Sequence, residues 1–175
     1  MKEYQERETE LVKKAKKGDT ASFARLYEQV YREMYRFALY TLKNPQDAED
    51  VVSETVLDAW IQIPNLRKAE SFRAWIFRIL SNKCRMKLKL YLQKTEELPE
   101  DLAAEEGDLS ERMDVRMAFS RLQNEERLIL SMNLFAGYTS REIGTFLGQS
   151  HNTIRSKQAR ALKKMETMLR RIDHG

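Results

Sequence analysis

Apolar residues recur at steps of three and four along most of the chain, which is the spacing of one face of an α-helix. The pattern is clearest in residues 23–42, and it returns in residues 45–63, 72–80, 128–135 and 154–172. Short breaks containing Gly, Pro, Asn or Asp separate several of these segments. The chain is therefore predicted to be all-α.

Some of these breaks carry specific helix start and stop signals. Gly18 follows a lysine-rich helix predicted over residues 8–17, and Asp19 is placed to cap the next helix. Asn44 and Pro45 form another start, because Asn is a preferred N-cap and Pro fits the first helical position. These signals set the order of helices in the first half of the chain.

One segment, residues 95–114, lacks a sustained apolar stripe and contains Pro99 and Gly107. It holds nine acidic residues and one basic residue. By contrast, residues 1–94 hold 19 basic and 13 acidic residues, and residues 115–175 hold 11 basic and five acidic residues. We therefore predict two small helical domains, 1–94 and 115–175, joined by a flexible acidic linker. Two basic blocks suit contact with one polyanion, although charged helical surfaces are also common.

The composition narrows the class of protein further. Apolar residues make up 42% of the chain and charged residues 33%, with one cysteine and two histidines. A single cysteine excludes an intrachain disulfide, and these residues form no four-ligand zinc site without carboxylates. No apolar run approaches the ~20 residues that cross a bilayer, and the N-terminus has no apolar signal core. We expect a cytoplasmic protein with no membrane insertion and no cofactor, in which Cys84 is a packing residue.

Residues 138–165 have the spacing of a helix-turn-helix. This motif needs a small residue where its helices cross, a residue that tolerates positive φ in the turn, and an apolar anchor in the second helix. Gly144, Gly148 and Ile154 fill these places in that order. The second domain is therefore predicted to contain a helix-turn-helix.

Both helices of the motif have well-specified starts. Thr139 and Glu142 form a T-x-x-E capping box for the first helix, and Ser150 is a good N-cap for the second. With Ile154 facing inward, the second helix turns one polar side outward: Asn152, Thr153, Arg155, Ser156, Ala159 and Arg160. That side is the predicted reader of DNA.

The first domain carries two charged stripes. On the helix that starts at Pro45, acidic residues follow at steps of three, four and four: Asp47, Asp50, Glu54 and Asp58. Such a stripe either faces solvent or binds a basic partner, since like charges one turn apart repel. On the next predicted helix Arg78, Asn82, Arg85 and Lys89 share one face, which favours contact with phosphates and base edges.

Four motifs in order make the chain resemble an extracytoplasmic-function (ECF) sigma factor, a two-domain initiation factor of bacterial RNA polymerase. DAEDVVSETVLDAW (47–60) resembles the polymerase-binding segment of the family, and SFRAWIFRILSNK (71–83) resembles its promoter-melting segment. LQNEERLIL (122–130) and GYTSREIGTFLGQSHNTIRSKQARALKKM (137–165) resemble the domain that reads the −35 element. Gln123 stands where the family usually has proline, and Gly144 where it usually has alanine.

The resemblance implies partners and residue roles. The acidic stripe would bind the β′ clamp coiled-coil of core RNA polymerase, whose β flap is a further expected contact. The loop residues Asn65, Leu66, Arg67 and Lys68 would hold a flipped base of the −10 element, beside Arg78, Asn82, Arg85 and Lys89. Expected −35 contacts are Ser150, His151, Asn152, Thr153, Arg155, Ser156 and Arg160.

The resemblance also implies a setting and a regulator. Family members often have an anti-sigma factor, commonly membrane-anchored, and act on nucleoid DNA. The main alternative is a stand-alone helix-turn-helix regulator, which usually needs a sensor pocket rather than two charged stripes. An enzyme is the third alternative, but no catalytic constellation is recognisable in the sequence.

Overall fold

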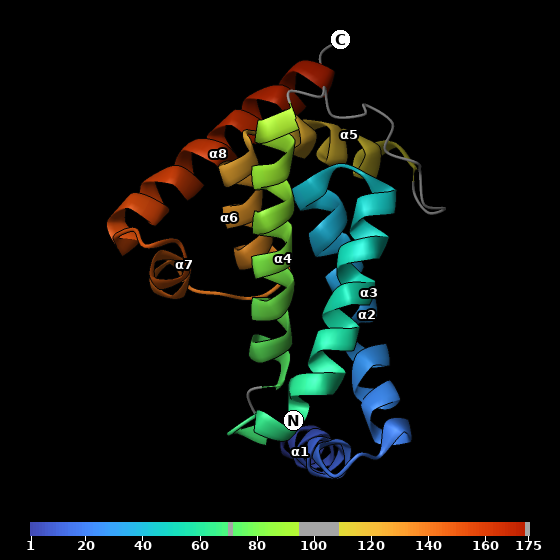
Figure 1. The fold of residues 1–175 in the computed structure, drawn as a ribbon. Coiled ribbons are helices and arrows are strands. Elements are labelled where there is room, and N and C mark those ends of the chain that lie inside the picture. Colours follow the sequence, from blue (N-terminus) through green and yellow to red (C-terminus); the bar gives the residue numbers. More distant parts are fainter. Residues whose placement is uncertain (70–71, 95–108, 174–175) are drawn as a thin grey trace.

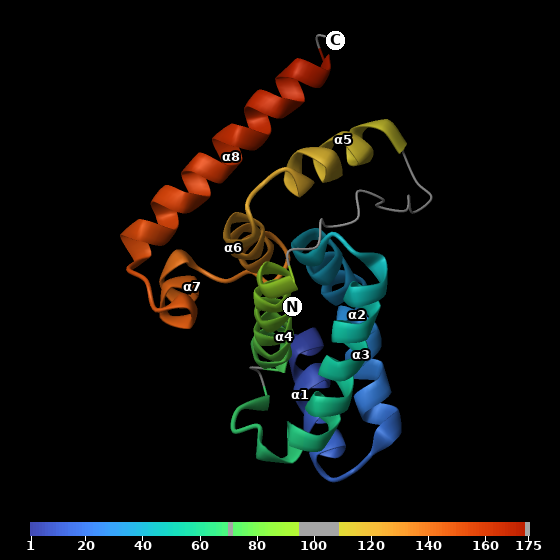
Figure 2. The ribbon, with the colours of Figure 1, turned by 45° about the horizontal axis from the view of Figure 1, so that its top comes forward.

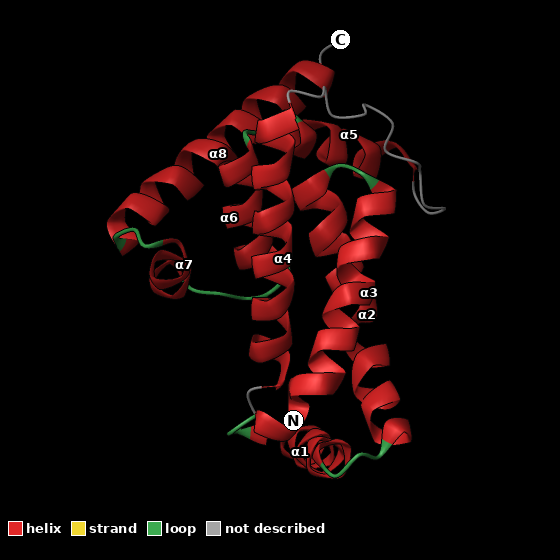
Figure 3. Cartoon of the chain, viewed as in Figure 1, coloured by secondary structure: helices red, strands yellow, loops and turns green. Residues whose placement is uncertain are grey.

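The computed structural model describes residues 1–69, 72–94 and 109–173, and every regular element in these ranges is a helix (Figure 3). The all-α prediction is confirmed. The helices are α1 (Lys2–Lys16), α2 (Thr20–Leu42), α3 (Pro45–Gln62), α4 (Phe72–Lys94), α5 (Leu109–Ser120), α6 (Asn124–Leu134), α7 (Ser140–Leu147) and α8 (His151–Asp173). A 3-10 turn, η1 (Ile63–Asn65), follows α3.

The first half of the chain is a bundle of α2, α3 and α4, with α1 lying across one end (Figure 1). The predicted apolar faces meet inside it, where Leu26, Met34, Phe37, Phe77 and Leu80 are fully buried. Cys84 is buried in the same core, as its predicted packing role requires. Burial also raises the pKa of its thiol, which keeps it protonated and unreactive.

Two predicted helix starts in this half are confirmed. Asp19 is the N-cap residue of α2, after Gly18 at a φ of 93°. Asn44 caps α3 because its side-chain oxygen accepts a hydrogen bond from the backbone N–H of Asp47 at 3.1 Å. Pro45 is the first residue of that helix.

In the second half, α5, α6 and α7 all contact the long helix α8 (Figure 2). Phe119, Leu122, Leu130, Ala161 and Met165 form its own small core between α5, α6 and α8. The helix-turn-helix pair, α7 and α8, projects from α6 at the side of α4 (Figure 1).

The two halves also pack against each other. Helix α6 lies against both α2 and α4, and α5 touches α2. Leu128, Ile129 and Met132 of α6 belong to the same continuous apolar cluster as Phe37 and Phe77. The two-domain helical architecture is thus present, but the domains are closed on one another in this chain.

Some helix boundaries differ from the prediction. Helix α1 starts at Lys2 rather than at residue 8, and α5 starts at Leu109, before the predicted start of the second domain at residue 115. The last residues of the predicted linker 95–114 are therefore helical, while residues 95–108 lie outside the described part of the chain. The N-cap of α6 is Gln123, whose backbone N–H donates to the Glu126 carboxylate at 3.0 Å.

Candidate nucleic-acid and polymerase interfaces

The helix-turn-helix has the geometry that its sequence predicts. A Cβ atom on Gly144 would lie 2.5 Å from the backbone oxygen of Gln149, so only glycine permits this close approach of turn and helix. Gly148 ends α7 with a φ of 68°, in the left-handed region. Ile154 is fully buried. The three predicted positions are confirmed.

Capping fixes where each helix of the motif starts. The Glu142 N–H donates to the Thr139 hydroxyl at 3.2 Å, and the Thr139 N–H donates to the Glu142 carboxylate at 2.8 Å. This is the predicted capping box. Ser150 caps α8, accepting from the Thr153 N–H at 3.2 Å. The hydroxyls of Ser150 and Thr153 also form a hydrogen bond with each other at 2.8 Å, so both side chains already have partners within the N-cap of α8.

The remaining predicted −35 residues lie on the outer face of α8. Five side chains are exposed there: His151, Asn152, Arg155, Ser156 and Arg160. They occupy the N-terminal half of a helix whose inner face is held by Ile154 and Ala161. An exposed row of cations and hydrogen-bonding groups at a helix N-terminus suits contact with phosphates and base edges in a major groove.

Two lysines on the other side of α8 anchor it to α6. Lys157 donates to Glu125 at 2.7 Å, and Lys164 donates to Glu126 at 2.6 Å. Burial alone would raise the pKa of Glu125, but the hydrogen bonds from Lys157 and Gln149 outweigh it, and its pKa lies below the usual value. These ion pairs fix the orientation of the exposed face of α8.

The predicted −10 helix is α4. Arg78, Asn82 and Lys89 are exposed, as predicted for a DNA-contacting face. Arg85, on the same face, is half-buried against the second domain. Its guanidinium lies 5.6 Å from the centre of the Phe146 ring and donates to the Phe146 carbonyl at 3.4 Å. The stripe is therefore partly occupied by α7.

The predicted base-binding loop lies beside this helix. Asn65, Arg67 and Lys68 are exposed, whereas the Leu66 side chain is buried in the core of the first domain. The Lys16 ammonium donates to the Leu66 carbonyl at 2.5 Å, which ties the loop to α1. Leu66 thus positions the loop, and the three polar residues are the ones that present side chains to a ligand.

A cavity of about 650 Å³ separates this loop from the helix-turn-helix. Its first-domain wall consists of the loop, Ala74, Trp75 and Arg78, and its second-domain wall of Met132, Tyr138, Glu142, Thr145 and Phe146. Trp75 lies within the apolar pattern of residues 72–80, but it is only half-buried and lines this space. The clue in the sequence was its place one turn before Arg78, on the same side of α4.

The acidic stripe on α3 is paired within the molecule. Lys83 of α4 lies 2.7 Å from Asp58 and 3.7 Å from Glu54. Lys87 lies 3.1 Å from Asp47, which also accepts a hydrogen bond from the Tyr91 hydroxyl. Burial and that bond raise the pKa of Tyr91, so the hydroxyl stays a donor.

Asp50 differs from the other members of the stripe. It is exposed, and its contact is with the Gln46 amide at 3.4 Å. Lys83 and Lys87 sit about 100° around α4 from the residues that precede them, Asn82 and Met86. Their ion pairs with Asp58 and Asp47 show that both lysines face α3, away from Asn82 and the predicted DNA face.

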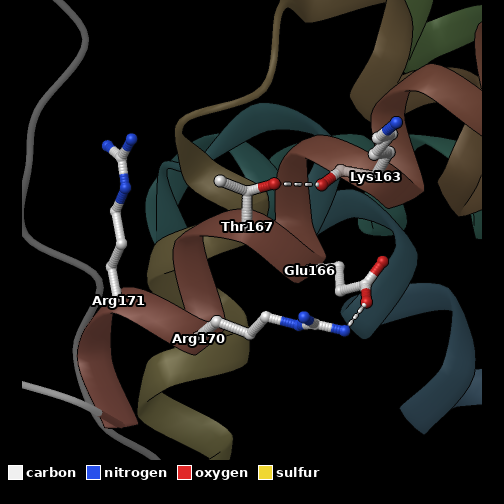
Figure 4. Close-up of a pocket in the computed structure, with 5 residues that line it drawn as sticks. All are labelled: Lys163, Glu166, Thr167, Arg170 and Arg171. Atoms are coloured by element: carbon white, nitrogen blue, oxygen red, sulfur yellow. Dashed lines mark hydrogen bonds and ion pairs between the residues drawn. The ribbon is translucent and has the colours of Figure 1, made fainter.

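Other parts of the described chain offer no competing site. No group of three or more His, Cys, Asp or Glu side chains is arranged to hold a metal ion within residues 1–69, 72–94 and 109–173. None of the helices in those ranges is long and apolar enough to cross a membrane. A shallow hollow near the end of α8 is lined by Lys163, Glu166, Thr167, Arg170 and Arg171, of which Arg170 and Glu166 pair with each other at 2.6 Å (Figure 4).

Comparison with known proteins agrees with this geometry. Residues 26–90 match the family "Sigma-70 region 2", and residues 118–166 match "Sigma-70, region 4". The sigma factor NccH of Alcaligenes xylosoxydans xylosoxydans is 27% identical over 173 residues, covering 91% of this chain and 92% of NccH. The ECF sigma factor SigM of Mycobacterium tuberculosis is 25% identical over 161 residues, covering 90% of this chain and 82% of SigM.

A solved structure has the same fold. Sigma factor RpoE of Bartonella quintana, in complex with the anti-sigma factor NepR, superposes with a TM-score of 0.69 at 21% identity, over 85% of this chain and 96% of RpoE. Both functional halves of the chain are thus matched in order, and its relatives align along nearly its whole length. The chain belongs to the ECF sigma factors, which direct RNA polymerase to promoters.

Proposed function

We propose that this chain gives core RNA polymerase its promoter specificity through the two DNA-facing surfaces described above. The observation that carries the proposal is the outer face of α8, where His151, Asn152, Arg155, Ser156 and Arg160 stand exposed on a complete helix-turn-helix. This face would enter the major groove of the −35 element. The loop residues Asn65, Arg67 and Lys68, with the stripe on α4, would hold the −10 strand.

The polymerase-binding surface is assigned to the acidic stripe of α3, with the β′ clamp coiled-coil as the basic partner and the β flap as a second contact. Lysines Lys83 and Lys87 would be displaced or shared when the partner arrives. An anti-sigma factor is a further proposed partner, since RpoE, which shares this fold, has been solved with one. Sigma factors are not enzymes, so the polymerase would supply the catalytic chemistry.

Runoff transcription with core polymerase of the source organism tests the proposal. Sheared genomic DNA is transcribed with and without the purified chain, and the 5′ ends of the new RNAs are mapped. Added chain should create starts that share a two-part upstream sequence. If the chain neither binds core polymerase nor changes the start sites, the proposal is wrong. If it instead binds duplex DNA tightly by itself, the stand-alone regulator is supported.

The residue Arg155 tests the −35 assignment. Arg155→Ala should weaken promoter use by about 1–3 kcal/mol, the magnitude of one bidentate base contact, and should relax preference at one position of the −35 element. Arg170→Ala, near the far end of the same helix, is the matched control and should leave the preference unchanged. A uniform loss over all −35 sequences would make Arg155 a phosphate contact instead.

The residue Asp50 tests the polymerase assignment. Asp50 is exposed, and within the described part of the chain its side chain accepts one hydrogen bond, from the Gln46 amide. Asp50→Lys should therefore weaken binding to core polymerase without lowering the melting temperature. Glu28→Lys on α2 makes the same charge change on another exposed position and serves as control. Equal pull-down of both variants by core polymerase would contradict the role of the stripe.

A further inference from the structure

The cavity between the loop and the helix-turn-helix has a lining that DNA binding alone does not account for. Its volume of about 650 Å³ lies within the range of about 300–1,000 Å³ that is usual for small-molecule sites. The lining combines three rings, three cations and one carboxylate: Trp75, Tyr138 and Phe146; Arg67, Lys68 and Arg78; and Glu142. Rings beside cations suit a ligand that joins a flat ring system to a negative group.

The three rings are held in place by contacts outside the cavity. Trp75 is half-buried, and its ring lies 6.0 Å from the buried ring of Phe72. The Tyr138 hydroxyl donates to the Ala74 carbonyl at 2.5 Å, and burial raises the pKa of Tyr138 to about 12, so the hydroxyl stays a donor at neutral pH. Phe146 is held from α4 by the guanidinium contact described above. Rings fixed in this way stack on a ligand with little loss of conformational freedom.

The three cations are not neutralised by neighbouring side chains. Arg67 and Lys68 are exposed on the loop that the buried Leu66 side chain positions, and Arg78 is exposed on α4. None of them forms an ion pair within residues 1–69, 72–94 and 109–173. The cavity therefore has an excess of positive charge, and guanidinium and ammonium groups are the usual protein partners of phosphate.

The carboxylate on the opposite wall is only partly used by the protein. The backbone N–H and the hydroxyl of Thr139 both donate to Oε2 of Glu142, as part of the capping box. The other oxygen, Oε1, accepts no hydrogen bond within the described part of the chain, so it can accept one from an N–H group of a ligand. Nucleobases carry such groups at the edge of a flat ring.

We propose that this cavity binds a free nucleoside triphosphate, with its base against the three rings and its phosphates at the three cations. A base stacks on aromatic side chains by its face, and phosphates accept hydrogen bonds from arginine and lysine. An inorganic anion would leave the rings unused, and an uncharged aromatic molecule would leave the cations unused. The proposal goes beyond promoter recognition, because neither DNA nor polymerase takes part in it.

Titration calorimetry of the full chain with ATP and with GTP measures the affinity. At about 150 mM salt, at least one of them should bind with a Kd below about 100 µM. Adenosine or guanosine and tripolyphosphate supply the base and the phosphates separately, and each should bind at least about tenfold more weakly than the triphosphate. A deoxyadenosine dinucleotide supplies the chemistry of a DNA strand, and it should also bind at least about tenfold more weakly.

The fluorescence of Trp75 reports where the base binds. Trp60 is the other tryptophan of the chain, so Trp60→Phe leaves Trp75 as the single emitter. A base that stacks in the cavity should quench this emission with the same Kd that calorimetry gives. Quenching that does not saturate would contradict a base bound against the three rings.

Two threonines give a matched pair of variants for the second-domain wall. Thr145 and Thr167 are both exposed on helices, and each hydroxyl donates to the carbonyl four residues earlier, at 3.1 and 3.0 Å. Thr145 lines the cavity, whereas Thr167 lies near the end of α8. Thr145→Glu should weaken triphosphate binding at least about fivefold by repelling the phosphates, and Thr167→Glu should change it less than about twofold.

The first-domain wall has its own matched pair. Lys68→Ala removes a cation of the cavity, and Arg32→Ala removes an exposed cation of α2. Lys68→Ala should weaken binding at least about fivefold and Arg32→Ala less than about twofold. No binding of either triphosphate at about 1 mM would overturn the proposal, and so would equal losses within either pair. Tripolyphosphate or the dinucleotide binding as tightly as the triphosphate would also overturn it, in favour of a simple anion site or a DNA strand. Promoter-specific initiation is tested separately, since these measurements contain no polymerase.

Discussion

Gly144 is the residue on which the helix-turn-helix most depends. Gly144→Ala puts a methyl group 2.5 Å from the Gln149 backbone oxygen, and the turn has to shift to accept it. Overpacking of this kind costs about 1–3 kcal/mol, against a gain of up to about 1 kcal/mol in helix propensity. We expect a net loss of about 1–2 kcal/mol, seen as a fall in melting temperature of roughly 3–8 °C.

The neighbouring substitution Thr145→Ala is the control for Gly144→Ala. Thr145 is exposed on the same helix and bonds only within it, to the carbonyl of Arg141 at 3.1 Å. It should change the melting temperature by a degree or so at most, as surface substitutions do. A Gly144→Ala variant as stable as wild type would mean that the turn adapts freely, and alanine, usual here in the family, would then be equally suitable.

Residue-level predictions succeeded where local geometry decides the residue. Gly144, Gly148 and Ile154 were identified from spacing because a turn, a close approach and an anchor each admit few residue types. Leu66 and Leu162 show the limit. The Leu66 side chain, placed in the predicted base-binding loop, is buried in the core, and Leu162, within the apolar pattern of residues 154–172, is half exposed. Their positions depend on how neighbouring elements pack, which the local sequence does not encode.

Helices α3 and α4 are joined by ion pairs that bear on polymerase binding. Lys83 lies between Asp58 and Glu54, at 2.7 and 3.7 Å, and these side chains are partly exposed. Such pairs contribute about 0–1 kcal/mol to stability. Lys83→Gln should therefore lower the free energy of unfolding by less than about 1 kcal/mol while leaving two carboxylates available to a basic partner.

The proposed polymerase role of the acidic stripe also predicts how Lys83→Gln should change the affinity for core polymerase. Lys83→Gln should strengthen binding to core polymerase by about threefold, since no internal cation then has to be displaced, equivalent to roughly 0.7 kcal/mol. Titration of labelled chain with core polymerase measures it, and urea unfolding measures the stability. Weaker binding at unchanged stability would mean that Lys83 itself contacts the polymerase.

At the level of elements, the sequence predicted the presence of each helix better than the residues at which it begins and ends. Helix α1 extends back to Lys2 because lysine, glutamate, glutamine and arginine are good helix formers without any apolar spacing, and Tyr4 holds the extension to Gln29 at 3.0 Å. Helix α5 begins inside the predicted linker, where acidic residues are compatible with a helix N-terminus. Apolar periodicity marks buried faces, and it misses helical turns that bury little.

At the scale of the whole molecule, the sequence predicted two domains but not their closure. The residues that join them had other interpretations in the sequence. Arg85 is predicted as one member of a DNA-binding face, and no pattern in the sequence sets Tyr40 or Arg127 apart. Tyr40 packs against Phe119. Arg85 bonds to Phe146, 61 positions away, and Arg127 bonds to Thr41, 86 positions away. Contacts of that separation follow from tertiary packing and leave no local pattern.

A shared core has a calorimetric consequence. Because α6 completes one apolar cluster with α2 and α4, the closed chain should unfold in a single transition, with an enthalpy of roughly 120 kcal/mol near 60 °C. Tyr40→Ala should divide the trace into two smaller transitions, whereas Tyr31→Ala should keep one, since its ring contacts lie within α2. Two transitions in wild type would mean that the domains unfold independently.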